Sequence, residues 1–500
     1  ETARLKQNFG SIAPWALVYS IFYAFCMYRN GSGITFPFFV AGSLLFFGFS
    51  LSKLGITLKK GSCFYIAAMM LLGVSTFCTD DGFLIFFNKL GIFLLLMSLL
   101  LKQFYNTSGW TTGKYLASIC TLVFTGMREL GRPVSDGSAW QQEKGKKTDK
   151  RIWYFAAGLL VGIPMLLVVL LLLASADVLF RQMAEGLLGS IRLGGIFNIF
   201  LRITVLFFCS YALIACLCRR RLREEVPDRR KGEPVTAITV TGLLTFLYLV
   251  FSGIQIGGLF LGRMQLPEGY TYAMYAREGF FQLLAVSMLN LVIVQVCLAY
   301  FRENRVLKVI LTVMSLCTFV MIASSGYRMI LYIRCYSLTY LRILVLWGLV
   351  LLALLFAGVV AGIFRKRFPL FRYQCAVVAV LYIALSFAHP DYWIAKMNVA
   401  DFHSGETDYG YLGTLSADAA PVLIPWMEKE GYRFEAFYAE NAVGYALDHC
   451  VGKEGGSFFY EREGFGYSWM GKLQMSMENF GIRTYNVSRY LAWKYFHLYG

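Results

Sequence analysis

The sequence predicts an all-α protein that crosses a membrane many times and carries a small helical domain at its C-terminal end. Three observations predict this class. About eleven apolar stretches of membrane-crossing length lie between residues 14 and 388. Hydrophobic residues make up 57% of the chain and charged residues only 15%, against about 25% charged residues in soluble domains. Lys and Arg are concentrated in alternate gaps between the apolar stretches, as in short cytoplasmic loops.

The apolar stretches define the predicted spans and the division of the chain. A helix needs about 20 apolar residues to cross the core of a bilayer. The predicted spans are 14–28, 35–52, 62–78, 83–101, 152–174, 195–218, 235–260, 279–300, 306–326, 341–363 and 371–388. They divide the chain into a four-span unit at 1–101, a linker at 102–151, a seven-span membrane domain at 152–388 and a helical domain at 389–500.

The distribution of positive charge predicts the orientation. Most of the Lys and Arg outside the spans lie in the N-terminal segment and in every second gap. Because short cytoplasmic loops collect these residues, the N-terminus is predicted to be cytoplasmic and the chain after His389 extracytoplasmic. Segment 115–127 is apolar but too short to span, so it is predicted to be an interfacial or re-entrant segment on the cytoplasmic side. If it crossed the membrane, the basic run 219–223 would lie outside.

The net charge of +17 raises the question of nucleic-acid binding. The basic residues flank apolar spans, where orientation and anionic lipid headgroups account for them. Nucleic acid is therefore not an expected partner. The expected partners are the lipid bilayer and an anionic lipid or envelope polymer.

Ionisable and polar residues near the outer ends of the spans form the candidate site. An ionisable group at membrane depth costs about 2.5–3.5 kcal/mol, so it requires a partner or water. Lys89 and Arg202 lie inside spans, and other charged or polar residues are predicted at the same level. The candidate vestibule comprises Lys89, Asp177, Arg202, Gln255, Arg277, Glu278, Asn290, Arg328, Tyr332 and Arg342.

Two interpretations of these residues are open. In the first, they snorkel, cap helices and pair with one another, for example Asp177 with Arg202. In the second, they line an outward-facing pocket with excess positive charge, which suits an anionic headgroup or polymer. No Asp or Glu lies in the middle of a span, which disfavours a proton-driven transporter. The short loop 29–34 has no carboxylate, which disfavours a lipid-sugar glycosyltransferase.

Residues 389–500 differ from the preceding chain in their mixed polarity and their many aromatic residues. Apolar residues recur there at helical spacing, which predicts a small folded domain rather than a disordered tail. All four histidines lie in this region, at positions 389, 403, 449 and 497. No pair of them has the spacing of a helical zinc site, and no serine lies in a nucleophile elbow. The sequence therefore predicts no metal, no cofactor and no catalytic residue.

Several motifs resemble one family of membrane proteins. Segments 173–180 (LASADVLF), 275–281 (YAREGFF) and 327–342 carry the first part of the resemblance. Residues 390–398, 415–419 (LSADA) and 486–489 (NVSR) carry the rest. These motifs are similar to the family named domain of unknown function 4173 and to its wider relative 4153, although Ser337 stands where the pattern leads us to expect Gly.

The resemblance covers about Lys150 to the C-terminus and implies a many-spanning protein of the bacterial plasma membrane with an external helical domain. It implies no activity, cofactor or catalytic residue. We therefore weigh a non-enzymatic sensor, receptor or assembly factor against an enzyme or flippase for an anionic lipid-linked substrate, and against a small-solute transporter. A vestibule closed by residues 389–410 favours the first function. A cavity lined by Arg202, Arg277 and Arg328 favours the second, and broken helices near mid-membrane favour the third.

Overall fold

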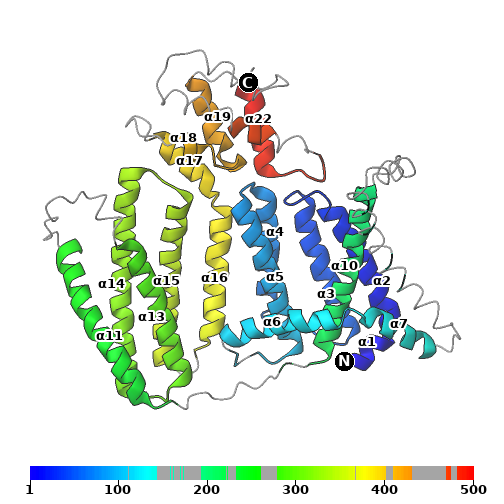
Figure 1. Ribbon diagram of the computed structural model, residues 1–500, viewed down its shortest axis with the longest axis horizontal. Helices are drawn as coiled ribbons and strands as arrows, with labels where there is room; N and C mark the ends of the chain where they lie inside the picture. The colour runs from blue at the N-terminus through cyan, green and yellow to red at the C-terminus, as the bar shows by residue number, and fades with distance from the viewer. Residues whose placement is uncertain are drawn as a thin grey trace. The chain divides into compact units, whose positions relative to one another are not determined.

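The computed structural model describes residues 1–107, 109–110, 112–143, 193–220, 222, 232–260, 279–365, 368–400, 409–430, 469–474 and 481–499, with single helical residues at 158, 162, 169 and 173. Within these residues the fold is helical and contains no β-strand (Figure 1). This confirms the predicted all-α class.

The chain forms two compact units. The N-terminal unit comprises Glu1–Phe77, Ile85–Val226 and Gly481–Asn486, and the C-terminal unit comprises Cys78–Leu84, Pro227–Phe480 and Val487–Gly500. Each unit therefore includes a short segment whose sequence neighbours belong to the other unit. The loop 78–84 is the segment that matters for the candidate site, because it brings residues from early in the chain into the C-terminal unit.

The N-terminal unit is built from apolar helices. It contains α1 (Thr2–Gln7), α2 (Phe9–Met27), α3 (Thr35–Lys53), α4 (Ser62–Cys78), most of α5 (Gly82–Phe104) and α10 (Leu193–Cys218) (Figure 1). Aromatic side chains fill the contact between α2 and α3. The rings of Tyr19 and Phe46 stack with their centroids 4.7 Å apart, and the Tyr19 hydroxyl forms a 2.8 Å hydrogen bond with Ser43.

The segment predicted to be interfacial or re-entrant lies within one crosswise helix, α6 (Thr112–Arg128). It lies across the lower ends of the neighbouring helices of its unit rather than beside them (Figure 1). Leu122 is buried on one side, whereas Phe124 and Met127 are exposed on the other. Glu129, just after α6, forms an ion pair with Arg219 at the end of α10. An interfacial helix would show this arrangement, and both the interfacial position and the side of the membrane stay predictions.

The C-terminal unit contains the membrane helices that carry most of the predicted polar residues. They are α11 (Pro234–Gln255) with the π-helical turn Ile256–Phe260, α13 (Phe280–Tyr300), α14 (Arg305–Tyr336), α15 (Tyr340–Phe364) and α16 (Leu370–Phe387). The long helix α14 packs against α11, α13 and α15 (Figure 1). Buried Leu311, Met314 and Met321 fill the space between α14 and its neighbours.

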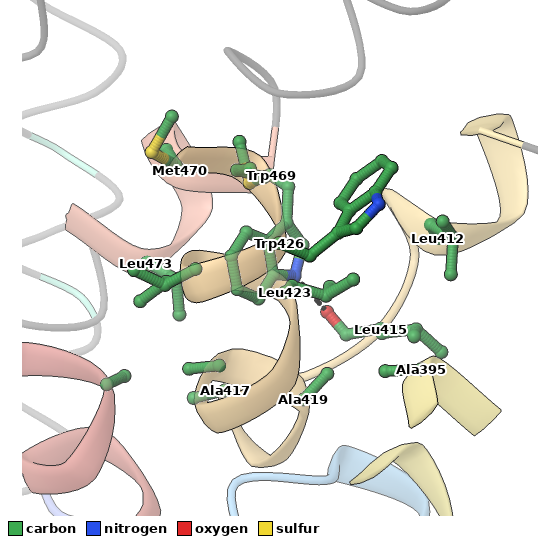
Figure 2. Packing of buried hydrophobic residues seen from close by; sticks show 14 of the residues in the cluster. Ala395, Leu412, Leu415, Ala417, Ala419, Leu423, Trp426, Trp469, Met470 and Leu473 are labelled. Atoms are coloured by element: carbon green, nitrogen blue, oxygen red, sulfur yellow. Dashed lines mark hydrogen bonds between the residues drawn. The ribbon is translucent and has the colours of Figure 1, made fainter. Parts of the chain in front are cut away.

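Short helices gather at one end of these membrane helices. They are α17 (Pro390–Ala400), α18 (Tyr409–Leu412), the 3₁₀ turn Ala417–Ala419, α19 (Ala420–Lys429), the helical residues 469–474 and α22 (Val487–Tyr499). We call these elements the cap. The indole N–H of Trp469 donates to the carbonyl of Leu415 at 2.9 Å inside the cap core (Figure 2). Ala417, Leu423 and Met470 belong to the same hydrophobic core (Figure 2), which also includes Leu338 in the turn between α14 and α15.

Nine helices of the described residues are long and apolar enough to span a membrane. They are Phe9–Met27, Thr35–Lys53, Gly82–Phe104, Asn198–Cys218, Pro234–Gly258, Phe280–Tyr300, Arg305–Arg334, Tyr340–Phe364 and Leu370–Phe387. The chain is therefore a membrane-embedded protein. The predicted span 62–78 corresponds to a shorter apolar helix, Ser62–Cys78. The predicted span 152–174 lies outside the described residues except for four helical positions.

Candidate functional site

The structure distributes the predicted vestibule residues between the two units. Asp177, Arg277 and Glu278 lie outside the described residues. Lys89 and Arg202 belong to the N-terminal unit. The Lys89 ammonium lies 5.7 Å from the centre of the Phe36 ring, and Arg202 donates to Asn198, one turn away on the same helix, at 2.9 Å.

Gln255 and Asn290 join helices inside the C-terminal unit. The Tyr248 hydroxyl donates to Asn290 Oδ1 at 2.9 Å, and Asn290 Nδ2 donates to Thr318 at 3.0 Å. Ser324 Oγ donates to the Gln255 side chain at 2.7 Å. These hydrogen bonds connect α11, α13 and α14. Because buried polar groups in membrane helices need such partners, both residues have a packing role here.

Tyr332 and Arg342 come together where α14 ends and α15 begins. The Arg342 guanidinium lies 4.4 Å from the centre of the Tyr332 ring, within the range of a cation–π contact. Arg342 also donates to the backbone carbonyls of Tyr336 at 2.7 Å and of Ser337. Arg328 is buried on α14, the helix that carries Tyr332, and its guanidinium packs beside Gly279 at the start of α13. This cluster is the part of the predicted vestibule that the structure assembles.

A second polar cluster lies at the base of the cap, and the sequence reading did not identify it. It consists of five buried or half-buried ionisable residues from separate parts of the chain. We call it the acid–histidine cluster, comprising Asp80, Asp81, His389, Asp391 and Asp418. All five belong to the C-terminal unit.

Asp418 is the centre of the acid–histidine cluster. Thr79 Oγ donates to Asp418 Oδ2 at 2.5 Å, and the backbone N–H of Asp80 donates to Oδ1 at 2.9 Å. His389 Nδ1 lies 3.0 Å from Asp418 Oδ2. Asp418 belongs to the 3₁₀ turn of the cap, so these bonds fix the loop 78–84 and the end of α16 against the cap.

Two residues of α22 complete the same junction. Arg489 Nε lies 2.7 Å from Asp80 Oδ1, and Ser488 Oγ donates to the carbonyl of Cys78 at 2.7 Å. On the other side, the backbone N–H of Ser416 donates to Asp391 Oδ2 at 2.8 Å. The cap is thus held to segment 78–84 by charged and polar contacts.

Asp81 is the N-terminal capping residue of the membrane helix α5. Its Oδ1 accepts hydrogen bonds from the backbone N–H groups of Phe83 and Leu84, at 2.8 and 3.4 Å, at the start of α5. Such a side chain satisfies backbone groups that have no partner within the helix. Its Oδ2 is buried without a hydrogen bond among the described residues, and the Tyr340 hydroxyl is the nearby polar group.

Burial shifts the ionisation of three carboxyl groups in the cluster. It raises the pKa of Asp80, although Arg489 opposes this shift, and it raises the pKa of Asp81. It also raises the pKa of Asp391 to about 6, against the hydrogen bonds from Ser416. Desolvation disfavours the charged form of an acid, so Asp391 exchanges a proton close to neutral pH.

Asp418 and His389 form the ionised pair of the cluster. Burial disfavours the charge of Asp418, but the hydrogen bond and the charge of His389, together with the hydrogen bond from Thr79, outweigh burial and hold its pKa below the usual value. The hydrogen bond to Asp418 raises the pKa of His389. The arrangement can therefore bind and release protons while holding the cap in place, and within the described residues no group of side chains has the geometry of a metal site.

The sequence contained a weak signal for this cluster. Asp391, Asp418 and Arg489 belong to the motifs of the family resemblance, but neither they nor Asp80 and His389 are among the predicted vestibule residues. The signal is the Thr79-Asp80-Asp81 turn, because two adjacent carboxylates in so short a connection between apolar helices require partners. The partners lie more than 300 positions away in the chain, and spacing alone does not reveal them.

The comparison with known proteins gives a family but no activity. The family described as a domain of unknown function (DUF4153) matches residues 66–425. The match begins well before Lys150, where the resemblance of the motifs began, and it includes every residue of the acid–histidine cluster. No curated protein and no solved structure shows significant similarity. Because the match covers most of the chain, the protein belongs to this family of unknown function.

Proposed function

We propose that this integral membrane protein is a non-enzymatic sensor, receptor or assembly factor of the bacterial cell envelope. The observation that carries the proposal is the position of α17 over the ends of α14 and α15. The Asn398 side chain donates to the carbonyl of Leu338 and accepts from its N–H, both at 2.9 Å. Ile394 and Ala395 are completely buried in the same contact. This packing of α17 against the turn between α14 and α15 supports a closed vestibule, which favours a sensor or receptor over an enzyme.

The polar contacts of the cap support the same proposal. A receptor needs a folded external domain whose state is transmitted to the membrane helices. The hydrophobic core of the cap includes Leu338 in the turn between α14 and α15, and the acid–histidine cluster connects the cap to the turn before α5 and to the end of α16. A ligand that changes the protonation or the position of these side chains would act on both the cap and the membrane helices.

The proposal includes the plasma membrane as the location and the cap as extracytoplasmic. The end of the C-terminal unit away from the cap carries Arg302, Arg305 and Lys308 in the turn between α13 and α14. Arg302 is exposed there and faces Glu233, and Lys308 pairs with Glu303. Positive charge at this end supports its assignment to the cytoplasm.

The test separates a sensor from an enzyme or flippase. Asn398→Ala removes the two bonds of α17 to Leu338, and Asn106→Ala, in a loop of the N-terminal unit, serves as the matched control. Cells lacking the protein and cells with Asn398→Ala are expected to share an altered envelope-stress response, without accumulation of lipid-linked intermediates in lipid extracts. Accumulation of such an intermediate in the deletion strain would contradict the proposal and indicate an enzyme or flippase.

A further inference from the structure

The exposed face of α17 has a composition unlike that of its buried face. Trp393 is 48% exposed and Met397 is 43% exposed. Lys396 lies between them, with its ammonium 5.1 Å from the Trp393 ring centre and 5.8 Å from the Tyr392 ring centre. Residues three and four apart share a face of a helix, so these four side chains form one continuous patch.

The position of α17 in the chain sets the level of this patch. Only two residues separate the end of the membrane helix α16 at Phe387 from the start of α17 at Pro390. Exposed apolar side chains run along α16 up to this point, including Val378, Val380 and Phe387. In Figure 1, α17 turns from the end of α16 over the end of α15. The patch therefore lies just beyond the end of a membrane helix whose side carries exposed apolar residues.

Other aromatic and basic residues lie at the same end of the unit. Tyr327 and Tyr336 are exposed on the last turns of α14, and Arg342 covers Tyr332. Trp and Tyr are enriched at both membrane–water interfaces, and Lys and Arg near helix ends extend their charges toward headgroups. The residues of α14, α15 and α17 together have the composition of such an interfacial belt.

We infer that the exposed face of α17 is a lipid-contact surface that binds the phosphate headgroups of anionic phospholipids through Lys396. Trp393 and Met397 lie in the interfacial layer, with the Trp393 ring against the acyl-chain boundary and the Lys396 ammonium toward phosphate. Lys396 has no carboxylate partner among the described residues, so its charge is available to a headgroup. The inference requires membrane embedding but not the sensor function.

This lipid contact lies on the same helix as part of the acid–histidine cluster. The buried face of α17 carries Asp391 and Asn398, and its exposed face carries Trp393 and Lys396. One short helix therefore separates the headgroup layer from the contacts that hold the cap. A change in the lipid composition would act first on the position of α17.

The first test measures bound lipid on the full-length protein. Lys396→Gln removes the proposed phosphate ligand, and Lys494→Gln changes an exposed lysine of α22 as the matched control. A basic residue at an anionic surface contributes about 1 kcal/mol, which corresponds to about a fivefold change in binding. Native mass spectrometry with added phosphatidylglycerol is expected to show about a fivefold loss of binding for Lys396→Gln and no loss for Lys494→Gln. Equal retention of phosphatidylglycerol by wild type and Lys396→Gln would overturn the inference.

The second test locates the contact without depending on affinity. A photo-crosslinking amino acid replaces Trp393 in the full chain, in nanodiscs that contain phosphatidylglycerol. Mass spectrometry is expected to find a phospholipid adduct on the peptide that contains α17. A crosslink to another protein, or within the cap alone, shows that this face is covered by protein and overturns the inference.

Discussion

At the scale of single residues, a buried carboxylate is costly unless it is protonated or paired, and the acid–histidine cluster combines both solutions. Asp80 pairs with Arg489, and Asp418 pairs with His389. The other two carboxyl groups have no cationic partner among the described residues, and burial raises the pKa of each. The cluster is therefore most stable where its unpaired acids hold protons and its histidine is charged.

We predict that the cap is more stable at mildly acidic pH than at mildly alkaline pH. The folded pKa of Asp391 is about 6, above the usual value of an aspartic acid, so the folded state binds more protons and stability falls as pH rises from that usual value to about 6. His389 has a raised folded pKa. The stability that His389 contributes is fully present below the pKa it has in the unfolded chain. This stability is lost as pH rises through the pKa it has in the folded protein. The measurement is the thermal unfolding midpoint of the purified protein as a function of pH.

Asp391→Asn and Asp418→Asn test this pH dependence, because they are expected to change the stability in opposite directions. The Asn side chain can still accept from Ser416 without a buried charge, so Asp391→Asn should increase stability at mildly alkaline pH by about 2–3 kcal/mol, on the basis of 1.36 kcal/mol per pKa unit. Asp418→Asn loses its charge pairing with His389 and should decrease stability at neutral pH. Loss of stability in both variants at mildly alkaline pH would contradict the assignment of Asp391.

The pair of Arg489 and Asp80 gives a second prediction at this scale. Removing one member of a well-buried pair costs about 3–5 kcal/mol because the other charge stays buried without a partner. Arg489 is partly exposed, so Arg489→Gln should cost about half as much, roughly 2 kcal/mol. The double variant Asp80→Asn, Arg489→Gln should recover most of the loss. Additive losses in the double-mutant cycle would show that the two residues do not interact.

At the scale of helices, hydrophobic length predicted most of the membrane elements. The predicted spans 35–52, 235–260 and 371–388 agree with Thr35–Lys53, Pro234–Gly258 and Leu370–Phe387 within a few residues. The prediction worked because a helix in lipid satisfies its backbone internally and shows its length directly in the apolar run. The sequence could not predict where α14 would end.

The helix α14 continues ten residues beyond its predicted end at 326, to Tyr336. A helix of 32 residues is about 48 Å long, more than the roughly 30 Å of a bilayer core. Its last turns carry the Tyr332 ring that Arg342 covers. The polar residues in these turns end the apolar run at residue 326, so hydropathy predicted a shorter helix than the one that continues to the cap.

The turn between α14 and α15 gives a prediction at the element scale. Ser337 has φ +70° and ψ 169°, a region that is essentially restricted to glycine. This conformation explains why glycine is expected at this position of the motif. Ser337→Gly should therefore stabilise the protein by about 1 kcal/mol, measured as a higher thermal unfolding midpoint.

A matched substitution tests whether the gain arises from the backbone. Ser287 is buried inside α13, where glycine costs about 0.5–1 kcal/mol in helix propensity. Ser287→Gly should lower the unfolding midpoint while Ser337→Gly raises it. A lower midpoint for both variants would show that the Ser337 side chain makes a contribution larger than the backbone strain.

At the scale of the whole molecule, the acid–histidine cluster explains why the sequence did not locate this site. The predicted boundary near residue 389 falls between α16 and α17. The cluster, however, joins Asp80 to Asp418 and Arg489. Contacts between residues so far apart in the chain depend on how the helices are assembled, which hydropathy and charge patterns do not encode.

The last prediction concerns the number of crossings and uses three reporter positions. If α2, α3, α4 and α5 all cross, residues 1 and 143 lie on the same side, because four crossings restore the original side. If segment 152–174 crosses together with α10, α11, α13, α14, α15 and α16, residue 500 lies on the opposite side, because seven crossings reverse it.

Fluorescent-protein fusions at residues 1 and 143 should therefore be fluorescent, and an alkaline phosphatase fusion at residue 500 should be active. A fusion at 143 on the side opposite residue 1 would remove α4 from the spans. An inactive phosphatase at residue 500, with residue 143 cytoplasmic, would remove segment 152–174 and place the cap in the cytoplasm.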